Sequence, residues 1–300
     1  MKLIIPLILL PDDNIPNMFD INKKKAFVCD LDGTIFLGGK PIPGAVKFIV
    51  ESQRSGRFKF FYLTNNTSKC PEEYLKKISG AAIPVKEEQI LTPLITLESY
   101  IREKDYQSVY LISSEAVKAH MKARLVDAGV DLEYDPEKNE LIALCYDREV
   151  TYEKLANACR LWNMRNVPPS QMCPVRTKNQ TPVDFVGTHP DNCCPSERGP
   201  IPDMGGLMKL LETTNGMKPS HVFGKPSPSL LAPVLAEFSR DEIAVVGDRL
   251  YTDKAIADNA GCDFVCVLSG ETTRADLAAY RGKAPAIVVE TFDKVDSAAS

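Results

Sequence analysis

Short apolar runs of strand length alternate with segments of helical period along almost the whole chain, and this alternation limits the fold more than any other feature. Strands that are separated by helices pair in parallel, in a sheet that helices cover on both faces. The sequence therefore predicts an α/β fold, a Rossmann-like doubly wound parallel sheet of five or six strands. Candidate strands for this sheet lie at 26–30, 58–64, 89–91, 220–223, 243–247, 263–268 and 286–289.

The same alternation starts again in the middle of the chain, with strands expected over 108–113, 141–146 and 183–187. A stretch rich in Pro, Gly and Cys, residues 191–203, follows and is predicted to be an irregular loop or domain junction. We therefore expect an inserted domain over 96–204 between two segments of one core domain, 1–95 and 205–300. Residues 1–24 are expected to form an N-terminal arm that lies on this core or on a neighbouring subunit, and a signal peptide is the less favoured interpretation.

The amino-acid composition limits which binding partners and which cellular location are expected for this protein. A formal charge of −4 argues against nucleic acid held mainly by phosphate contacts. The apolar stretch 3–10 is shorter than the ~20 residues that a membrane-spanning helix needs, so no membrane partner is expected. Nine cysteines without a repeating framework favour reduced thiols and a cytoplasmic protein, and the small number of histidines, three, argues against a zinc site.

Two aspartates follow the first predicted strand, in the run Asp30-Leu31-Asp32-Gly33-Thr34. The first closes the strand, and Gly33 lets the chain turn sharply, so both carboxylates are expected near the carboxyl edge of the sheet. Such a pair suits phosphoryl transfer, in which one carboxylate attacks phosphorus and the other protonates the leaving oxygen and then activates water. A simple Asx-rich turn is the alternative interpretation.

Neutral donors and a lysine follow two other predicted strands. Thr64, Asn65 and Asn66 offer a hydroxyl and backbone amides that can hold phosphate oxygens, although capping of the next helix is an alternative. Lys225 lies where a strand gives way to a helix and could neutralise a phosphate and a nucleophilic carboxylate together. An exposed lysine in a turn is the alternative there.

Two further carboxylates follow the strand 243–247. Asp30 would repel a phosphate dianion, and Mg²⁺ bound by Asp30 and Asp248 would remove that obstacle, since Mg²⁺ prefers a few carboxylates together with water and substrate oxygens. Asp253 is expected either beside these metal ligands or as an acidic residue at the start of a helix.

The order of these motifs resembles the haloacid dehalogenase superfamily. The resemblance covers about residues 25–290 and rests on Asp30-Leu31-Asp32-Gly33-Thr34, Thr64-Asn65-Asn66, Lys225 and Gly247-Asp248-Arg249-Leu250-Tyr251-Thr252-Asp253. Further stretches are similar to subfamily IIA, the NagD-like and p-nitrophenyl phosphatase-like group. They are Pro41-Ile42-Pro43-Gly44-Ala45, Leu63-Thr64-Asn65-Asn66-Thr67-Ser68-Lys69, Gly224-Lys225-Pro226-Ser227-Pro228 and Val267-Leu268-Ser269-Gly270.

The resemblance implies a role for each site residue. Asp30 would be the nucleophile and Asp32 the general acid and base, while Asp30, Asp248 and the backbone carbonyl of Asp32 would hold Mg²⁺. Thr64, Asn65, Asn66 and Lys225 would bind phosphate, and Asp253 would orient Lys225 or the water around the metal. The insert would be a C2-type α/β cap whose loop with His189 and Asp191 faces the site, and related caps often form homodimers.

We therefore predict a Mg²⁺-dependent phosphatase that hydrolyses small phosphomonoesters, such as nucleoside monophosphates or sugar phosphates, through an aspartyl-phosphate. A phosphotransferase or phosphomutase with the same intermediate is the first alternative. A non-catalytic binding protein on this scaffold is the second, and it is disfavoured because every catalytic group is present. His189 has two interpretations, a contact with the leaving group or a surface residue packed in its loop.

Overall fold

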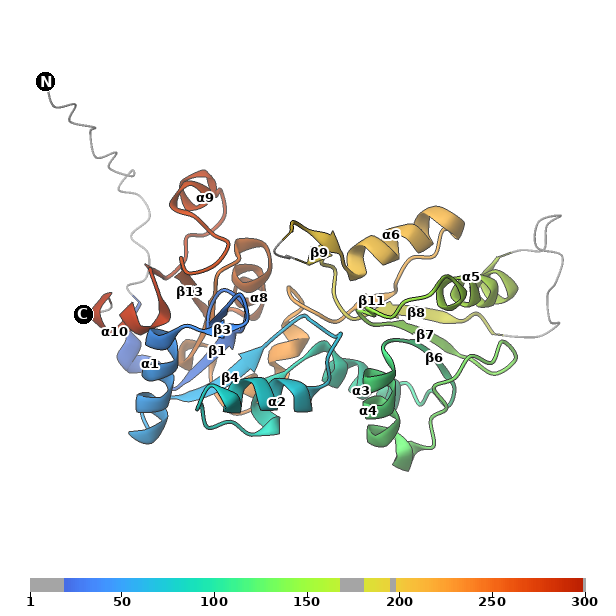
Figure 1. Ribbon diagram of the computed structural model, residues 1–300, viewed down its shortest axis with the longest axis horizontal. Coiled ribbons are helices and arrows are strands. Elements are labelled where there is room, and N and C mark those ends of the chain that lie inside the picture. Colours follow the sequence, from blue (N-terminus) through green and yellow to red (C-terminus); the bar gives the residue numbers. More distant parts are fainter. Residues whose placement is uncertain (1–18, 168–180, 195–197, 299–300) are drawn as a thin grey trace, which may run out of the picture.

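The computed structural model describes residues 19–167, 181–194 and 198–298 (Figure 1). Of the expected N-terminal arm, 1–24, only 19–24 lie among these residues, and there Phe19 and Ile21 are buried in the core. No helix in the described ranges combines the length and apolar character needed to cross a membrane.

The larger sheet, on the left of Figure 1, has six parallel strands. Their order is β14 (Ile287–Val289), β13 (Asp263–Val267), β12 (Ile243–Gly247), β1 (Ala26–Asp30), β4 (Lys59–Leu63) and β5 (Ile90–Leu91). The predicted Rossmann-like parallel sheet is thus confirmed. The central β1 is buried at every residue, as expected for a strand covered on both faces.

Each face of this sheet is covered by helices. Alternate residues of β1 divide between the faces, Phe27 and Cys29 toward one core cluster and Ala26 and Val28 toward the other. The first face packs on α1 (Pro43–Arg54), α2 (Pro71–Gly80) and α10 (Val295–Ala298), and the second on α7 (Ala232–Leu235), α8 (Ala255–Ala260) and α9 (Arg274–Ala279).

A second, smaller sheet on the right of Figure 1 has four parallel strands, in the order β11 (His221–Val222), β8 (Asp184–Gly187), β7 (Leu141–Leu144) and β6 (Val109–Ile112). One face packs on α3 (Pro93–Glu103) and α4 (Glu115–Arg124), and the other on α5 (Tyr152–Asn166) and α6 (Met204–Asn215). We call this four-stranded sheet with its helices the cap unit.

The cap unit extends further along the chain than expected. Strand β11 pairs with β8, and Met204, Met208 and Leu211 of α6 are buried against the smaller sheet. The sequence placed the end of the insert at residue 204 because α6 and β11 continue the same alternation that the larger sheet uses. In the structure the chain returns to the larger sheet only after Phe223. That the two units fold as separate domains stays a prediction.

Two short antiparallel pairs complete the fold. One, β2 (Phe36–Leu37) with β3 (Lys40–Pro41), follows the turn after β1. The other, β9 (Cys193–Cys194) with β10 (Ile201–Pro202), lies within the stretch that was predicted to be irregular. Segments of two residues are too short to produce a recognisable alternation.

Candidate active site

Three carboxylates meet at the carboxyl edge of the larger sheet. Asp30 ends β1, while Asp248 and Asp253 follow the neighbouring β12. Each offers one oxygen, and these three atoms lie within 4.8 Å of one another. Parallel strands end at the same edge, so residues far apart in the sequence converge here.

Glycines leave the space in which these carboxylates lie. A Cβ on Gly33, whose φ is +94°, would lie 2.3 Å from Asp248 Oδ2, and one on Gly270 would lie 1.9 Å from the same atom. A Cβ on Gly247 would lie 2.4 Å from the side chain of Asp253. Any side chain at these positions would displace an acid, so the three glycines define the shape of the site.

Lys225 is buried between two of the acids. Its Nζ donates hydrogen bonds to Asp30 Oδ1 at 2.5 Å and to Asp253 Oδ1 at 2.6 Å. Burial opposes the charge on Lys225, but Asp253 and Asp30 outweigh it and raise the pKa of Lys225, which stays an ammonium. Burial also raises the pKa of Asp30, against the attraction of Lys225. The single positive charge of Lys225 therefore stands against a cluster of three carboxyl groups, two of which it contacts.

The remaining negative charge is concentrated on Asp248. Its Oδ2 accepts a hydrogen bond from the amide of Glu271, whereas its buried Oδ1 has no hydrogen-bond partner among the described residues. Burial and the charge of Asp253 raise the pKa of Asp248 to about 6. Both oxygens of Asp253 are engaged, by Lys225 and by the amide of Arg249. An unpartnered oxygen beside Asp30 fits a hard cation.

Replacing Lys225 with Met is expected to lower the free energy of unfolding by about 3–5 kcal/mol, because two buried carboxylates lose their shared cation. Lys59→Met is the matched control. Lys59 pairs with Glu237 at the surface, with both side chains at least 40% exposed, and such a pair contributes at most about 1 kcal/mol. Urea denaturation of the metal-free proteins measures both changes, and equal losses would contradict the buried position of Lys225.

The loop after β4 carries the predicted phosphate donors. Thr64 and Asn65 are buried. Asn65 Oδ1 accepts a hydrogen bond from the amide of Lys225 at 2.7 Å, which joins this loop to the lysine. The side chain of Asn66 is used differently, because its Oδ1 accepts from the amide and hydroxyl of Ser68. The expected cluster thus contains Thr64 and Asn65, while Asn66 stabilises the turn.

Asp32 lies apart from the other acids. Its side chain is 60% exposed, and its Oδ1 lies 2.9 Å from Nζ of Lys77 in α2. Asp32 follows the end of β1 by two residues, but spacing along a turn does not determine where a side chain points, and the cation of α2 attracts this carboxylate outward. Lys77 itself lies over the ring of Phe36.

The cap unit contributes the loop with His189 and Asp191. Asp191 Oδ2 accepts a hydrogen bond from Asn65 Nδ2 at 3.1 Å, so this acid does reach the site. His189 is only 1% exposed, with its ring nitrogens 3.6 Å from Asp191 and 3.5 Å from Asp203. Burial opposes ionisation of Asp191, but its contacts with His189 and Asn65 lower its pKa. The interpretation of His189 as a surface residue was wrong.

Comparisons with known proteins show which family this chain belongs to. Residues 27–127 match the family model for haloacid dehalogenase-like hydrolases, and residues 222–295 match a second model of HAD hydrolase-like proteins. An acid sugar phosphatase of Staphylococcus haemolyticus is 31% identical over 84% of this chain and 88% of its own length. The chain belongs to the haloacid dehalogenase-like hydrolases. An acid sugar phosphatase of Staphylococcus aureus is also 31% identical, over 84% of this chain and 90% of its own length.

Solved structures of the same hydrolase family share the fold. A 4-nitrophenylphosphatase of Thermotoga maritima superimposes with a TM-score of 0.78 at 30% identity, covering 93% of this chain and 99% of its own. A p-nitrophenyl phosphatase of Archaeoglobus fulgidus has a TM-score of 0.76 at 26% identity, covering 92% and 99%. NagD of E. coli, at 22% identity and a TM-score of 0.74, supports the fold alone. The predicted membership in the haloacid dehalogenase-like hydrolases, and the expected likeness to phosphatases of that family, are thus confirmed.

Sequence reasoning missed three residues around this haloacid dehalogenase-type site. They are Lys77, which holds Asp32, Asp203, which lies against His189, and Thr67, which joins the loop after β4 to the cap unit. Lys77 occurs as one of several lysines on a helix, and nothing in its spacing distinguishes it. Thr67 stands in the stretch 63–69 that carried the resemblance, but the sequence alone assigned it no role.

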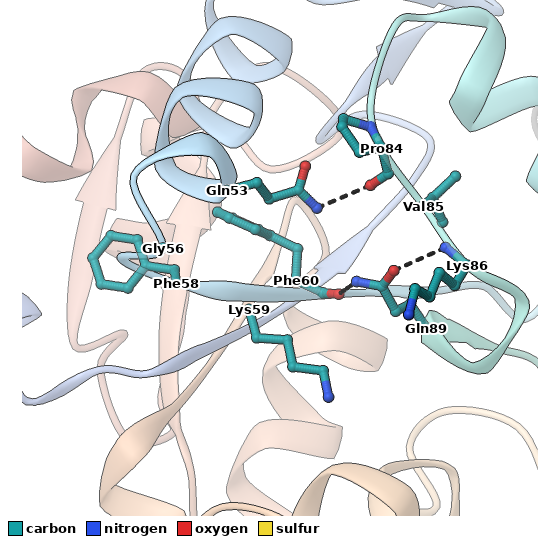
Figure 2. Close-up of a pocket in the computed structure, with 9 residues that line it drawn as sticks. All are labelled: Gln53, Gly56, Phe58, Lys59, Phe60, Pro84, Val85, Lys86 and Gln89. Carbon is teal, nitrogen blue, oxygen red and sulfur yellow. Dashed lines mark hydrogen bonds between the residues drawn. The ribbon is translucent and has the colours of Figure 1, made fainter.

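A pocket of about 350 Å³ lies away from the site (Figure 2). Figure 2 shows that two of its polar side chains bond to the backbone around it, Gln53 to the carbonyl of Pro84 and Gln89 to the carbonyl of Phe60. Lys59, which also lines it, begins β4, whereas Thr64 directly follows the end of that strand. The pocket therefore lies at the opposite edge of the sheet from the three acids.

Proposed function

We propose that this hydrolase is a Mg²⁺-dependent phosphatase that cleaves small phosphomonoesters through an aspartyl-phosphate on Asp30. The observation that carries the proposal is the pairing of Asp30 with buried Lys225 beside the unpartnered Oδ1 of Asp248. A carboxylate held at 2.5 Å from an ammonium has a fixed position, which is what a nucleophile needs. The phosphatase names of the relatives support the same reaction.

Asp30 and Asp248 would hold the metal, together with the backbone carbonyl of Asp32. Mg²⁺ would supply Lewis acidity at a phosphoryl oxygen and offset the charge of the acids. Asp253 is assigned to Lys225 and not to the metal, because both of its oxygens already accept hydrogen bonds. Of the two roles that the resemblance implied for Asp253, this assignment selects the orientation of Lys225.

The chain's own residues would then act in two steps. In the first, Asp30 attacks phosphorus while Asp32 donates a proton to the leaving oxygen; Thr64, the amide of Asn65 and Lys225 hold the phosphoryl oxygens. In the second, Asp32 takes a proton from a water molecule that attacks the aspartyl-phosphate and releases Asp30. Asp32 has to leave Lys77 for both steps, which costs little because exposed ion pairs contribute only about 0.2–1 kcal/mol.

The substrate would be a small phosphorylated metabolite. The acid sugar phosphatases among the relatives favour sugar phosphates over nucleoside monophosphates. Contacts from the cap loop with Asp191 would select among such esters, because this loop reaches Asn65. A cytoplasmic location and a homodimer formed through the cap unit stay predictions.

Asp32→Asn tests the two-step reaction. With 4-nitrophenyl phosphate, whose leaving group needs no proton, we expect a rapid burst of about one nitrophenol per active site. Steady turnover should then be about 10²–10⁴-fold slower than in the wild type, because the base that activates water is missing. Rapid-mixing absorbance measures both phases.

Glu51→Gln, which changes an exposed acid in a loose pair with Lys47, is the control and should retain wild-type turnover. An Asp32→Asn enzyme that loses burst and turnover equally would contradict the covalent intermediate. Adding an alcohol acceptor to the wild type separates hydrolysis from transfer, since a phosphotransferase would form the new ester in place of inorganic phosphate.

A further inference from the structure

The loop after β4 is attached to the cap unit by Thr67. This residue is fully buried, and its Oγ1 accepts a hydrogen bond from the amide of Tyr146, just beyond β7, at 2.9 Å. The same oxygen lies 2.9 Å from Oγ1 of Thr188, just beyond β8. One side chain of the larger unit thus lies between the ends of two adjacent strands of the smaller one.

A second contact runs parallel to the first. Asn65 donates a hydrogen bond to Asp191 of the cap loop and accepts one from the amide of Lys225. Residues 65 and 67 therefore bind the cap unit from the same short loop, and Asn66 between them is fixed on the other side by Tyr74 of α2, whose hydroxyl donates to its carbonyl. A displacement of the cap unit must either break buried hydrogen bonds or move this loop.

We propose that Thr67 is a positioning residue that couples the cap unit to phosphate binding. It acts through Thr64 and the amide of Asn65, which lie three and two residues before it on the loop that it fixes. The inference rests on the proposed phosphate-binding role of that loop. Coupling between two sites is reciprocal, so phosphate bound at Thr64 and Asn65 holds the strand ends of the cap unit in place.

The variants Thr67→Val and Thr67→Ser separate this coupling from simple packing. Valine keeps the shape but leaves the buried amide of Tyr146 without its acceptor, whereas serine keeps the hydroxyl. In Thr67→Val we expect the inhibition constant for inorganic phosphate, measured with Mg²⁺ well below the melting temperature, to rise by roughly 3- to 30-fold, the usual range for residues that couple two sites. In Thr67→Ser the inhibition constant should stay within about twofold of the wild-type value.

Steady-state kinetics give a second measurement. In Thr67→Val we expect kcat to fall and KM to rise, because the loop binds the phosphoryl group before and during the reaction.

Amide hydrogen exchange supplies the readout that a merely structural role would not change. In the wild type, phosphate with Mg²⁺ should slow exchange in residues 142–147 and 184–191 of the cap unit, and in Thr67→Val this response should be lost. If the wild type itself bound no phosphate, the proposed function would fail. If Thr67→Val kept the wild-type inhibition constant and exchange response, only the coupling would be overturned. Thr188→Val, which removes one of the two partners, provides an intermediate effect should Thr67→Val not fold.

Discussion

Asp30→Asn is expected to reduce turnover of any phosphomonoester by about 10⁴-fold or more while the protein stays folded. The amide has nearly the shape of the carboxylate but cannot attack phosphorus, and loss of a nucleophile usually has effects of this size. The fold should survive because Lys225 keeps its second carboxylate partner, Asp253. Phosphate release over a panel of sugar phosphates and nucleotides, with melting temperature measured in parallel, checks both parts.

The matched control for this variant is Asp263→Asn. Asp263 begins β13 and pairs with Lys24, so it lies at the opposite edge of the same sheet. It should retain wild-type turnover. Residual activity of Asp30→Asn within about tenfold of the wild type would overturn the assignment of the nucleophile.

Mg²⁺ is expected to stabilise the wild type strongly and the Asp248→Asn variant hardly at all. A ligand that binds only the folded state at a hundred times its Kd adds about 2.7 kcal/mol to the free energy of unfolding. Without metal, Asp248→Asn should be more stable than the wild type. Burial is the largest cause of the raised pKa of Asp248 and repulsion from Asp253 is the next, and the uncharged amide removes this repulsion. The variant should also be nearly inactive. Thermal melts with and without Mg²⁺ measure these shifts.

The pH dependence of stability gives a second check on Asp248. Its pKa is about 6 in the folded protein, against about 3.9 in an unfolded chain. Its protonated form therefore stabilises the fold fully below about pH 4, and this contribution is lost as the pH rises through 6. Metal-free wild type should thus lose stability relative to Asp248→Asn from pH 4 to 6, and Mg²⁺ should offset the loss. An equal Mg²⁺ shift in wild type and Asp248→Asn would show that the metal binds elsewhere.

The strands and the main cluster could be predicted because they depend on local pattern and on one rule of topology. Parallel strands place their carboxyl ends at one edge, so Asp30, Asp248 and Lys225 could be expected to meet before any coordinates were known. The direction of Asp32 and the burial of His189 could not, because they depend on which charged side chains approach from α2 and from the end of the cap loop. The boundary of the insert was missed for another reason: α6 and β11 suit either sheet, and only strand pairing decides between them.

Residues 223–225, where the chain returns from the cap unit to the larger sheet, link the part that would select the substrate to the part that would perform the chemistry. Phe223 is buried with the cap unit, and Lys225, two residues later, already contacts Asp30 at 2.5 Å. A change in the cap that shifts this connection by a fraction of an ångström therefore alters the charge balance around the nucleophile. Cap variants selected for a new ester should accumulate substitutions in loops remote from residues 223–225, where specificity can change without disturbing the ammonium that the reaction depends on.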